Sequence, residues 1–328
     1  MNAPNTTSYT PTFAELAGDV DSFLSGYFDT KPMLRRGALA DRHQELLTFD
    51  DLDQMLSTGT IRPPYIRIFQ NGQLVHDNAY TRLLQVQGEV ITDCVDPAKV
   101  TRLLRDGATV TWNSLNHFRP NLRPLAAELA ARFAARVDVM AFLARPHNQG
   151  FRPHADAVDL FVIQLTGTKH WRAWMPPRPH SADGVEYHTD DELGAPLIDT
   201  TLRPGDVLYL PYGTPHAVAT EDTTSLHLSV MIRPRLWADL LNRVVQRLLR
   251  AEPEFARFPY LNQDNRPALT DGFQRHTKRL ADLLMAIDPE EAVTGQLAWP
   301  GAAEGARTST ALSTYLRETD SPPGQAHT

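Results

Sequence analysis

The chain has 328 residues, 42% of them hydrophobic, and a formal net charge of −7 at pH 7. This length suits two or three domains, or one large domain with appendages, and the apolar fraction can fill a substantial core. The acidic balance argues against general nucleic-acid binding, although a local basic patch stays compatible with it.

Cys94 is the single cysteine, so an intrachain disulfide is excluded and a reducing compartment is expected. The first residues lack the basic start and the apolar core of a signal peptide. No apolar run reaches the roughly 18 residues that a membrane-spanning helix requires. We therefore expect a cytoplasmic protein that makes no membrane contact.

The first part of the chain is predicted to alternate short helices and strands. Apolar residues recur at helical spacing over residues 12–28, and residues 48–56 form a short helix that begins with a threonine cap. The Asn71-Gly72 pair between two apolar runs predicts a hairpin over residues 65–75.

Four further elements lead to the middle of the chain. A helix is expected over residues 97–105, with Asp96 as its cap, and a strand over residues 109–112. Apolar spacing predicts an amphipathic helix over residues 122–135, and residues 137–144 form a strand. This strand enters the segment on which the functional prediction depends.

That segment is predicted to be a hairpin of two apolar strands, over residues 156–165 and 169–175. Gly167 supplies the positive φ that the turn between them needs. His154 and Asp156 stand at the start of the first strand. Because residues two apart on a strand point to one face, this imidazole and this carboxylate can bind one metal ion.

A histidine followed two residues later by an acid is weak evidence alone, since chance yields roughly one such triplet in a chain of this composition. Two other triplets occur here, at His43/Glu45 and His188/Asp190. The first precedes a helix-like segment and the second lies in a polar connection. Only the pair in the hairpin opens an apolar strand, so we favour it.

A third ligand is expected from a later strand. Residues 207–210 read as a buried strand, and a tight loop over residues 211–215 delivers His216. Two histidines and one carboxylate with open positions opposite form the facial triad of non-haem Fe(II) oxygenases. The alternative is a surface histidine at position 154 and a hydrogen-bonded loop histidine at position 216; we favour the metal site.

Two long segments and a short one carry a more specific pattern. They read PHNQGFRPHADAVDLFVIQLTGTKHWRAWMP, GDVLYLPYGTPHAVAT and SLHLSV. These segments resemble the ribosomal oxygenases, the cupin-like branch of the JmjC 2-oxoglutarate oxygenases, and the resemblance covers about residues 10–295. It implies that His154, Asp156 and His216 are the catalytic iron ligands and that Lys169 binds the distal carboxylate of 2-oxoglutarate. The alternative for Lys169 is a solvated hairpin lysine.

Three other positions concern the same pocket. Met140 and Phe142 stand where close relatives in this family usually carry an asparagine and a tyrosine that line the pocket. The resemblance therefore implies the same reaction as in the relatives, but it does not imply the same substrate. His227, in the short motif, is predicted to be a core histidine with a hydrogen bond; the alternative is a pocket residue near the iron.

After residue 234 the pattern becomes helical, with two broad apolar stripes. We expect residues 235–299 to form a helical dimerisation module, as the resemblance also implies, although the stripes could pack on the chain's own barrel. Residues 300–328 are rich in small residues and proline and are predicted to be disordered. The resemblance implies a winged-helix domain in this region, and the tail is expected to be truncated relative to it.

The predicted fold class is mixed α+β: a double-stranded β-helix (cupin/JmjC jelly roll) over residues 91–234, flanked by helices and strands over residues 1–90. The resemblance implies an Fe(II)- and 2-oxoglutarate-dependent homodimeric dioxygenase. It would hydroxylate a side chain of a protein or peptide, with a ribosomal-protein histidine or arginine as one candidate. The alternatives are hydroxylation of a free amino acid or natural-product peptide, demethylation, and a non-catalytic cupin-like metal- or ligand-binding protein.

Overall fold

The computed structural model describes residues 9–148, 152–178, 185–257, 259 and 266–297. The tail predicted over residues 300–328 lies outside the described residues. The described chain falls into two compact units, one ending at Arg233 and one beginning at Pro234.

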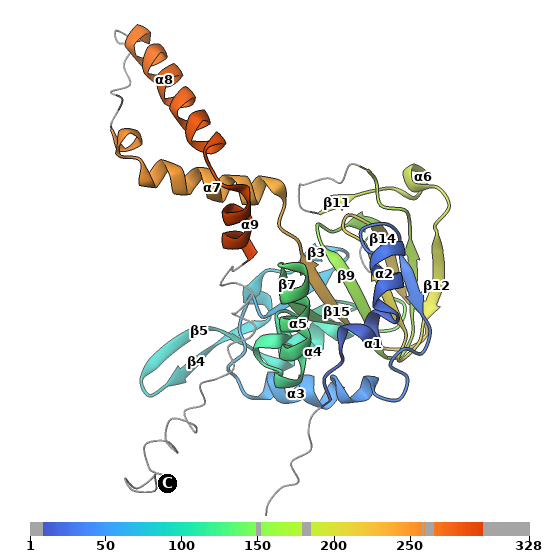
Figure 1. Cartoon of the computed structure of the whole chain (residues 1–328). Coiled ribbons are helices and arrows are strands. Elements are labelled where there is room, and N and C mark those ends of the chain that lie inside the picture. The colour runs from blue at the N-terminus through green and yellow to red at the C-terminus, as the bar shows by residue number, and fades with distance from the viewer. Residues whose placement is uncertain (1–8, 149–151, 179–184, 258, 260–265, 298–328) are drawn as a thin grey trace, which may run out of the picture. The chain divides into compact units, whose positions relative to one another are not determined.

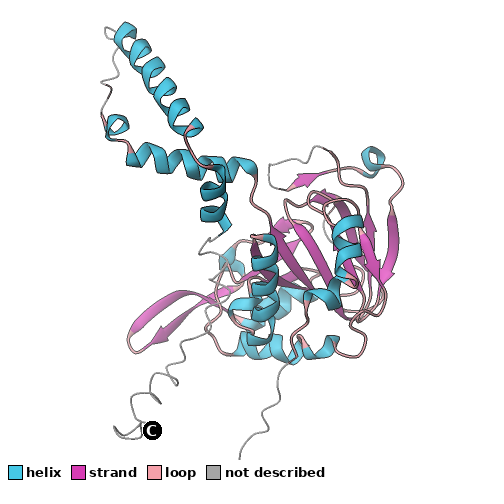
Figure 2. Cartoon of the chain, in the orientation of Figure 1, coloured by secondary structure: helices cyan, strands magenta, loops and turns pink. Residues whose placement is uncertain are grey.

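The first unit is a mixed α+β structure built on two antiparallel sheets (Figure 2). In the described residues the larger sheet contains eight strands in the order β1-β13-β9-β15-β7-β6-β2-β3. They are β1 (Met33–Arg35), β2 (Ile66–Gln70), β3 (Gln73–Leu74), β6 (Thr109–Trp112), β7 (Arg136–Ala144), β9 (Asp159–Thr166), β13 (Val207–Leu210) and β15 (Ser225–Arg233).

The smaller sheet contains five described strands in the order β11-β8-β14-β10-β12. They are β8 (His154–Ala155), β10 (Lys169–Ala173), β11 (Glu186–Tyr187), β12 (Ile198–Leu202) and β14 (Pro215–Thr220). A separate hairpin pairs β4 (Thr81–Val86) with β5 (Glu89–Val95); Figure 1 shows it extending away from the sheets.

Short helices accompany the sheets of this unit (Figure 1). They are α1 (Phe13–Ala17), α2 (Val20–Gly26), α3 (Phe49–Ser57), α4 (Pro97–Arg105), α5 (Arg123–Phe133), α6 (Asp190–Leu193) and the 3-10 turns η1 (His43–Glu45), η2 (Asp77–Ala79), η3 (Leu115–His117) and η4 (Pro120–Leu122). No helix among the described residues combines the length and hydropathy needed to cross a bilayer.

Within the larger sheet β9 is buried on both faces, which explains why it reads as a continuous apolar run. On one face Phe161 packs with Phe13 of α1 and Phe23 of α2, with ring centroids 6.2 and 5.6 Å away. On the other face Leu160 and Val162 join a second apolar cluster that includes residues of the smaller sheet. Each face of β9 therefore has its own core.

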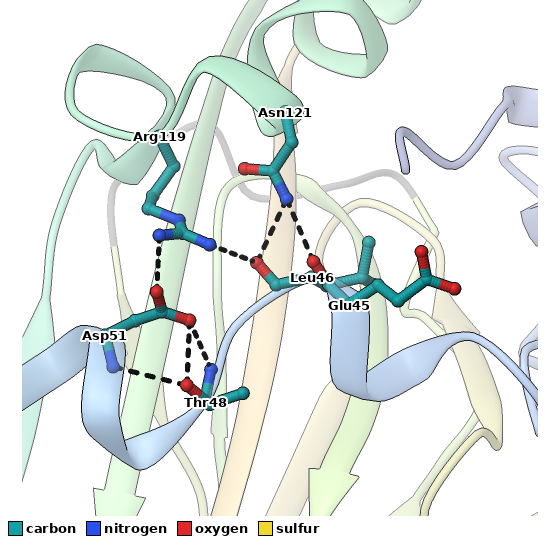
Figure 3. Close-up of polar contacts among 6 residues, drawn as sticks. All are labelled: Glu45, Leu46, Thr48, Asp51, Arg119 and Asn121. Atoms are coloured by element: carbon teal, nitrogen blue, oxygen red, sulfur yellow. Dashed lines mark hydrogen bonds and ion pairs between the residues drawn. The ribbon is translucent and has the colours of Figure 1, made fainter. Parts of the chain in front are cut away.

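Local capping chemistry explains where α3 begins and how it is attached (Figure 3). The Thr48 hydroxyl accepts from the Asp51 N–H, and the Asp51 carboxylate accepts from the Thr48 N–H at 2.9 Å. Arg119 donates to the other oxygen of Asp51 at 2.6 Å, and Asn121 donates to the carbonyl of Leu46 at 3.2 Å. These bonds join the N-terminal segment to the turns that precede α5.

Several predicted elements are confirmed. The helices over residues 48–56, 97–105 and 122–135 are present as α3, α4 and α5, and the hairpin over residues 65–75 forms from β2 and β3. The hairpin predicted from the strands over residues 156–165 and 169–175 is wrong: the turn at Gly167 forms, but β9 pairs with β13 and β15 in the larger sheet, whereas β10 pairs with β14 and β12 in the smaller one. Gly167 has a φ of 65° in that turn, and an added Cβ would come within 2.1 Å of the Thr224 carbonyl oxygen.

Three further expectations need correction. The single helix over residues 12–28 is wrong, because Gly18, at a φ of 81°, ends α1 before α2 begins. The polar connection after residue 178 contains a strand, β11, which pairs with β8. The β4–β5 hairpin was not predicted; its turn is at Gly88, at a φ of 89°.

The second unit is helical among its described residues. It consists of α7 (Trp237–Ala251), η5 (Pro253–Ala256), α8 (Arg266–Met285) and α9 (Pro289–Leu297). Neither α7 nor α8 contains a buried residue. The apolar stripes that predicted these helices are thus half-buried for the most part, with Leu241 and Phe273 exposed.

Candidate metal centre

The structure brings the three predicted metal ligands together. His154 of β8 and His216 of β14 are direct partners across two antiparallel strands of the smaller sheet. Asp156 follows β8, and its carbonyl accepts from the Gly213 N–H at 3.0 Å. The predicted strand over residues 156–165 is wrong at its start: β8 and β9 belong to different sheets, and Asp156 lies in the crossing between them.

The three side chains converge on one point. The Nε2 atoms of His154 and His216 each lie 3.9 Å from the same oxygen of Asp156. At a bond length of about 2.1 Å, two ligand atoms on one ion are at most about 4.2 Å apart, so these separations fit a shared cation. Among the described residues this is the only such cluster of histidine, cysteine and acidic side chains.

Hydrogen bonds orient both imidazoles as ligands. The Nδ1 of His154 is 3.0 Å from the carbonyl of Arg152, and the Nδ1 of His216 is 3.0 Å from the carbonyl of Thr214. A carbonyl can only accept, so Nδ1 carries the hydrogen and Nε2 keeps its lone pair. Burial, followed by the charge of His154, lowers the pKa of His216 to about 4, which keeps it neutral at pH 7.

Lys169, the first residue of β10, faces the same pocket. It is only 4% exposed. Within the described part of the chain, its ammonium makes no hydrogen bond and no ion pair. Burial lowers its pKa to about 8. A buried cation without a partner is costly, and an anionic ligand would offset that cost. The solvated alternative for Lys169 is therefore wrong.

His227 also lines this pocket. Its ring stacks on Phe142, with centroids 4.9 Å apart and planes 1° apart, and Trp171 meets it edge-on. Burial, followed by the charge of Lys169, holds the pKa of His227 well below its usual value. Its Nδ1 and the Nε1 of Trp171 are buried without a hydrogen-bond partner. The prediction of a core histidine with a hydrogen bond is therefore wrong, and the pocket alternative holds.

The two residues at which the resemblance predicted a departure, Met140 and Phe142, lie in different places. Phe142 lines the triad pocket, whereas Met140 lines a neighbouring groove. Both belong to β7 and point to the same face, because they are two residues apart. The sequence predicted that both residues lie near the site, but not that Phe142 lines the triad pocket while Met140 lines the groove beside it.

The other two histidine–acid triplets serve local structure. His43 is buried in η1, and its Nδ1 is 2.8 Å from the carbonyl of Ala40. Asp190 forms an ion pair of 2.8 Å with Arg172. Neither triplet belongs to the cluster of metal-ligand side chains.

The triad lies in a part of the chain that is similar to known proteins. Residues 114–240 match the family described as the JmjC domain. Over 298 residues the chain is 26% identical to ribosomal oxygenase 1 of Danio rerio, covering 84% of this chain and 53% of that protein. Residues 114–240 thus match the JmjC domain, and the chain as a whole is similar to a ribosomal oxygenase.

Other JmjC relatives carry a composite name. The chain is 25% identical over 300 residues to the bifunctional lysine-specific demethylase and histidyl-hydroxylase NO66 of Aedes aegypti, covering 85% of this chain and 45% of that protein. It is 30% identical over 241 residues to the protein of the same name in Dictyostelium discoideum, covering 72% of this chain and 45% of that protein. The chain thus spans about half the length, or less, of the curated JmjC proteins it matches.

Solved structures show the same fold. The ribosomal oxygenase YcfD of Escherichia coli, in complex with cobalt and 2-oxoglutarate, aligns with a TM-score of 0.54 at 18% identity. The alignment covers 86% of this chain and 72% of that one. At this identity the likeness establishes the JmjC-type fold of the chain.

Proposed function

We propose that the chain is an Fe(II)- and 2-oxoglutarate-dependent oxygenase that hydroxylates a side chain of a protein or peptide. One observation carries the proposal: the triad of His154, Asp156 and His216 shares a pocket with a buried lysine that lacks a partner. A metal-binding module needs the triad alone. An unpaired ammonium in the same pocket is explained by an anionic co-substrate.

The strand order supports a double-stranded β-helix as the architecture. From β7 to β15 the chain alternates between the sheets except at β10, β11 and β12, which all belong to the smaller sheet. Two runs of four strands result, β7-β15-β9-β13 and β8-β14-β10-β12. This is the winding expected of a cupin or JmjC jelly roll. We place the catalytic core at residues 91–234, with residues 1–90 flanking it.

The donor set fits Fe(II), because imidazole and carboxylate ligands with open positions are the facial triad of non-haem iron oxygenases. When bound, iron and 2-oxoglutarate would activate O2 for attack on an unactivated C–H bond: one oxygen atom would enter the substrate and the other would enter succinate, with CO2 released from 2-oxoglutarate. His154, Asp156 and His216 would hold the metal. The Nδ1 hydrogen bonds of the two histidines keep the ligand atoms aimed at one point.

The remaining pocket residues suit a dicarboxylate. The Lys169 ammonium would pair with its distal carboxylate as a point charge. The Trp171 Nε1–H is a buried donor without a partner, and the Nδ1 of His227 is a buried nitrogen without one; a bound dicarboxylate would satisfy Trp171, and also His227 in the tautomer with a proton on Nδ1. Phe142 and Leu160 line the same pocket and exclude water from it.

We favour hydroxylation over demethylation. The relatives' names include both activities, and a methylated lysine substrate would bring a positive charge into the pocket. Among the described lining residues Asp156 is the only carboxylate, and Lys169 adds a second cation. A neutral or anionic side chain is therefore better accommodated than a methylammonium group.

We further propose that the chain forms a homodimer through residues 235–299. Trp237, Leu241 and Phe273 are large apolar side chains that stand exposed on the helices of this unit. Exposed apolar patches of this kind mark association surfaces. We also place the protein in the cytoplasm, where a lone cysteine and an Fe(II) site are both suited to the reducing environment.

An anaerobic titration tests the proposal without a known substrate. Fe(II) followed by 2-oxoglutarate should produce a visible metal-to-ligand charge-transfer band that requires both additions. The band should be absent in His154→Ala and His216→Ala, and Lys169→Ala should need far more 2-oxoglutarate to form it. His170→Ala is the matched control, because His170 pairs with Asp199 and lies outside the triad pocket.

Two results would redirect the assignment. Iron binding without a band in the wild type would favour a metal-binding protein that does not use 2-oxoglutarate. A band with succinate formation, but with no mass gain of one oxygen on any protein or peptide, would favour a free amino acid or a natural-product peptide as substrate.

A further inference from the structure

A groove continues from the triad pocket along the larger sheet. On β15, His227, Ser229 and Met231 line the triad pocket, and Met231 and Arg233 line the groove. Met231 therefore belongs to both. Alternate residues of one strand share a face, so the groove extends the floor of the pocket toward the end of β15. A substrate chain that enters the pocket can lie along this floor.

Neighbouring strands complete the groove. Met140 pairs with Ser229, Asp138 with Met231, and Arg136 with Arg233 across β7 and β15. Arg67 and Phe69 of β2, together with Tyr65 before it, line the other side. We call this surface the arginine groove and define it by Arg67, Arg136, Asp138, Met140, Met231 and Arg233.

The charges in the arginine groove are unbalanced. Asp138 is already satisfied: it pairs with Arg136 at 3.0 Å and accepts from the Ser114 hydroxyl at 3.1 Å. Arg67 and Arg233 have no ion-pair or side-chain hydrogen-bond partner among the described residues. Two guanidinium groups beside the pocket are therefore available to bind an anionic ligand.

We propose that the arginine groove holds the substrate polypeptide, and that Arg67 and Arg233 select a segment with acidic side chains beside the oxidised residue. This inference rests on the proposed function and names its substrate class. Guanidinium groups match carboxylates in geometry and charge. Met140 and Met231 supply an apolar, adaptable floor for the intervening side chains.

A nucleic acid fits this surface less well. Affinity for a phosphate backbone depends on an array of cations spaced along the ligand. Here two unpaired arginines are separated by apolar and neutral polar side chains, and Asp138 adds a negative charge between them. A peptide with localised carboxylates matches that mixture better.

Binding of designed peptides tests the proposal directly. The probes are three fluorescein-labelled peptides of equal length in which alanine alternates with glutamate, glutamine or lysine. Fluorescence anisotropy is recorded anaerobically with the full chain, Fe(II) and 2-oxoglutarate present. We expect the glutamate peptide to bind at least about tenfold more tightly than the other two.

Charge reversal locates the binding. Arg67→Glu/Arg233→Glu should weaken binding of the glutamate peptide by at least about tenfold and remove the preference over the glutamine peptide. Arg105→Glu/Arg203→Glu is the matched control, since both are exposed arginines outside the groove. A photoreactive form of the glutamate peptide should crosslink to Met140 or Met231, as mapped by mass spectrometry.

Three outcomes would overturn the inference. They are preference for the lysine peptide, an equal effect of the control double variant, and tighter arginine-dependent binding of a single-stranded oligonucleotide than of the glutamate peptide. The charge-transfer band is recorded in the same samples and should survive in Arg67→Glu/Arg233→Glu. A missing band with intact peptide selectivity would count against the oxygenase assignment alone.

Discussion

The two units of this chain use apolar residues in opposite ways. In the first unit, β9 is buried along its length up to its last residue, and Phe161 is 0% exposed. In the second unit, α7 and α8 bury no residue, and Phe273 is 77% exposed. Both regions show strong apolar patterns in the sequence, yet only the first uses its pattern to build a core.

The difference explains where a catalytic site can stand. A pocket that must hold an unpaired lysine and three ligands at fixed positions needs rigid strands packed on both faces. The first unit supplies this, with an aromatic core behind β9 and a second apolar cluster in front of it. The exposed apolar side chains of the second unit suit association instead. Five measurements test the roles assigned to the two units.

The largest expected effect is on core packing. Phe161→Ala should lower the free energy of unfolding of the first unit by about 4 kcal/mol, because it removes a fully buried ring from an aromatic cluster. Phe273→Ala should change the unfolding of the second unit, measured with the protein dilute, by less than about 0.5 kcal/mol. Urea denaturation measures both free energies of unfolding. Equal decreases in the two variants would show that the two units use their apolar residues in the same way.

The next effect is a gain in stability from removing the buried cation. The pKa of Lys169 falls from 10.5 to about 8 in the folded protein. Below pH 8 both folded and unfolded states carry the charge, so the desolvation cost is fully present there. It fades as the pH rises toward 10.5. Lys169→Met should therefore stabilise the ligand-free protein at pH 7 by on the order of 3 kcal/mol.

The same variant must also lose its co-substrate if the role of Lys169 is right. Titration with 2-oxoglutarate, followed by the charge-transfer band, should show no saturation in Lys169→Met. A variant that gains stability and keeps its affinity for 2-oxoglutarate would remove Lys169 from the site.

Self-association should depend on the second unit. Trp237 is 75% exposed. Trp237→Glu/Phe273→Glu should weaken homodimer formation by at least about tenfold, because it places charges in an apolar interface. Leu83→Glu is the control, since Leu83 is an exposed apolar residue of the β4–β5 hairpin in the first unit. Analytical ultracentrifugation measures the dissociation constant of the dimer in each variant. If only Leu83→Glu abolishes the dimer, the interface lies in the first unit.

The smallest expected effect is a pH dependence of co-substrate affinity. With a pKa of about 8, the Lys169 ammonium loses its proton as the pH rises through that value. The affinity for 2-oxoglutarate should therefore fall by about tenfold between pH 7 and pH 9. An ordinary lysine, with a pKa of 10.5, would leave the affinity unchanged over this range.

Much of the local structure could be predicted from the sequence because its causes are local. The cap of α3 at Thr48 and the turn at Gly167 depend on a few neighbouring residues. The candidate ligands His154 and His216 stood out because each lies beside a buried apolar strand and follows a turn or loop. Lys169 was indicated by the family resemblance, and its burial came only with the structure.

Other features depended on partners distant in the chain. The two-residue strand β11 exists because it pairs with β8, and its own residues carry no strand pattern. His227 read as a core residue from alternation alone, which shows that a side chain is buried but not which cavity it faces. Its stacking on Phe142 follows from the register of β15 against β7.

The sequence alone determined the chemistry that is available: two histidines, a carboxylate and a lysine in strand-forming contexts. Only the tertiary structure decided that Asp156 lies between two sheets, that Lys169 has no partner, and that Arg67 and Arg233 share one groove. The physical reason is the distance along the chain between the residues that interact. Turns and caps are set by neighbouring residues, whereas strand order and register follow from the burial of the whole sheet.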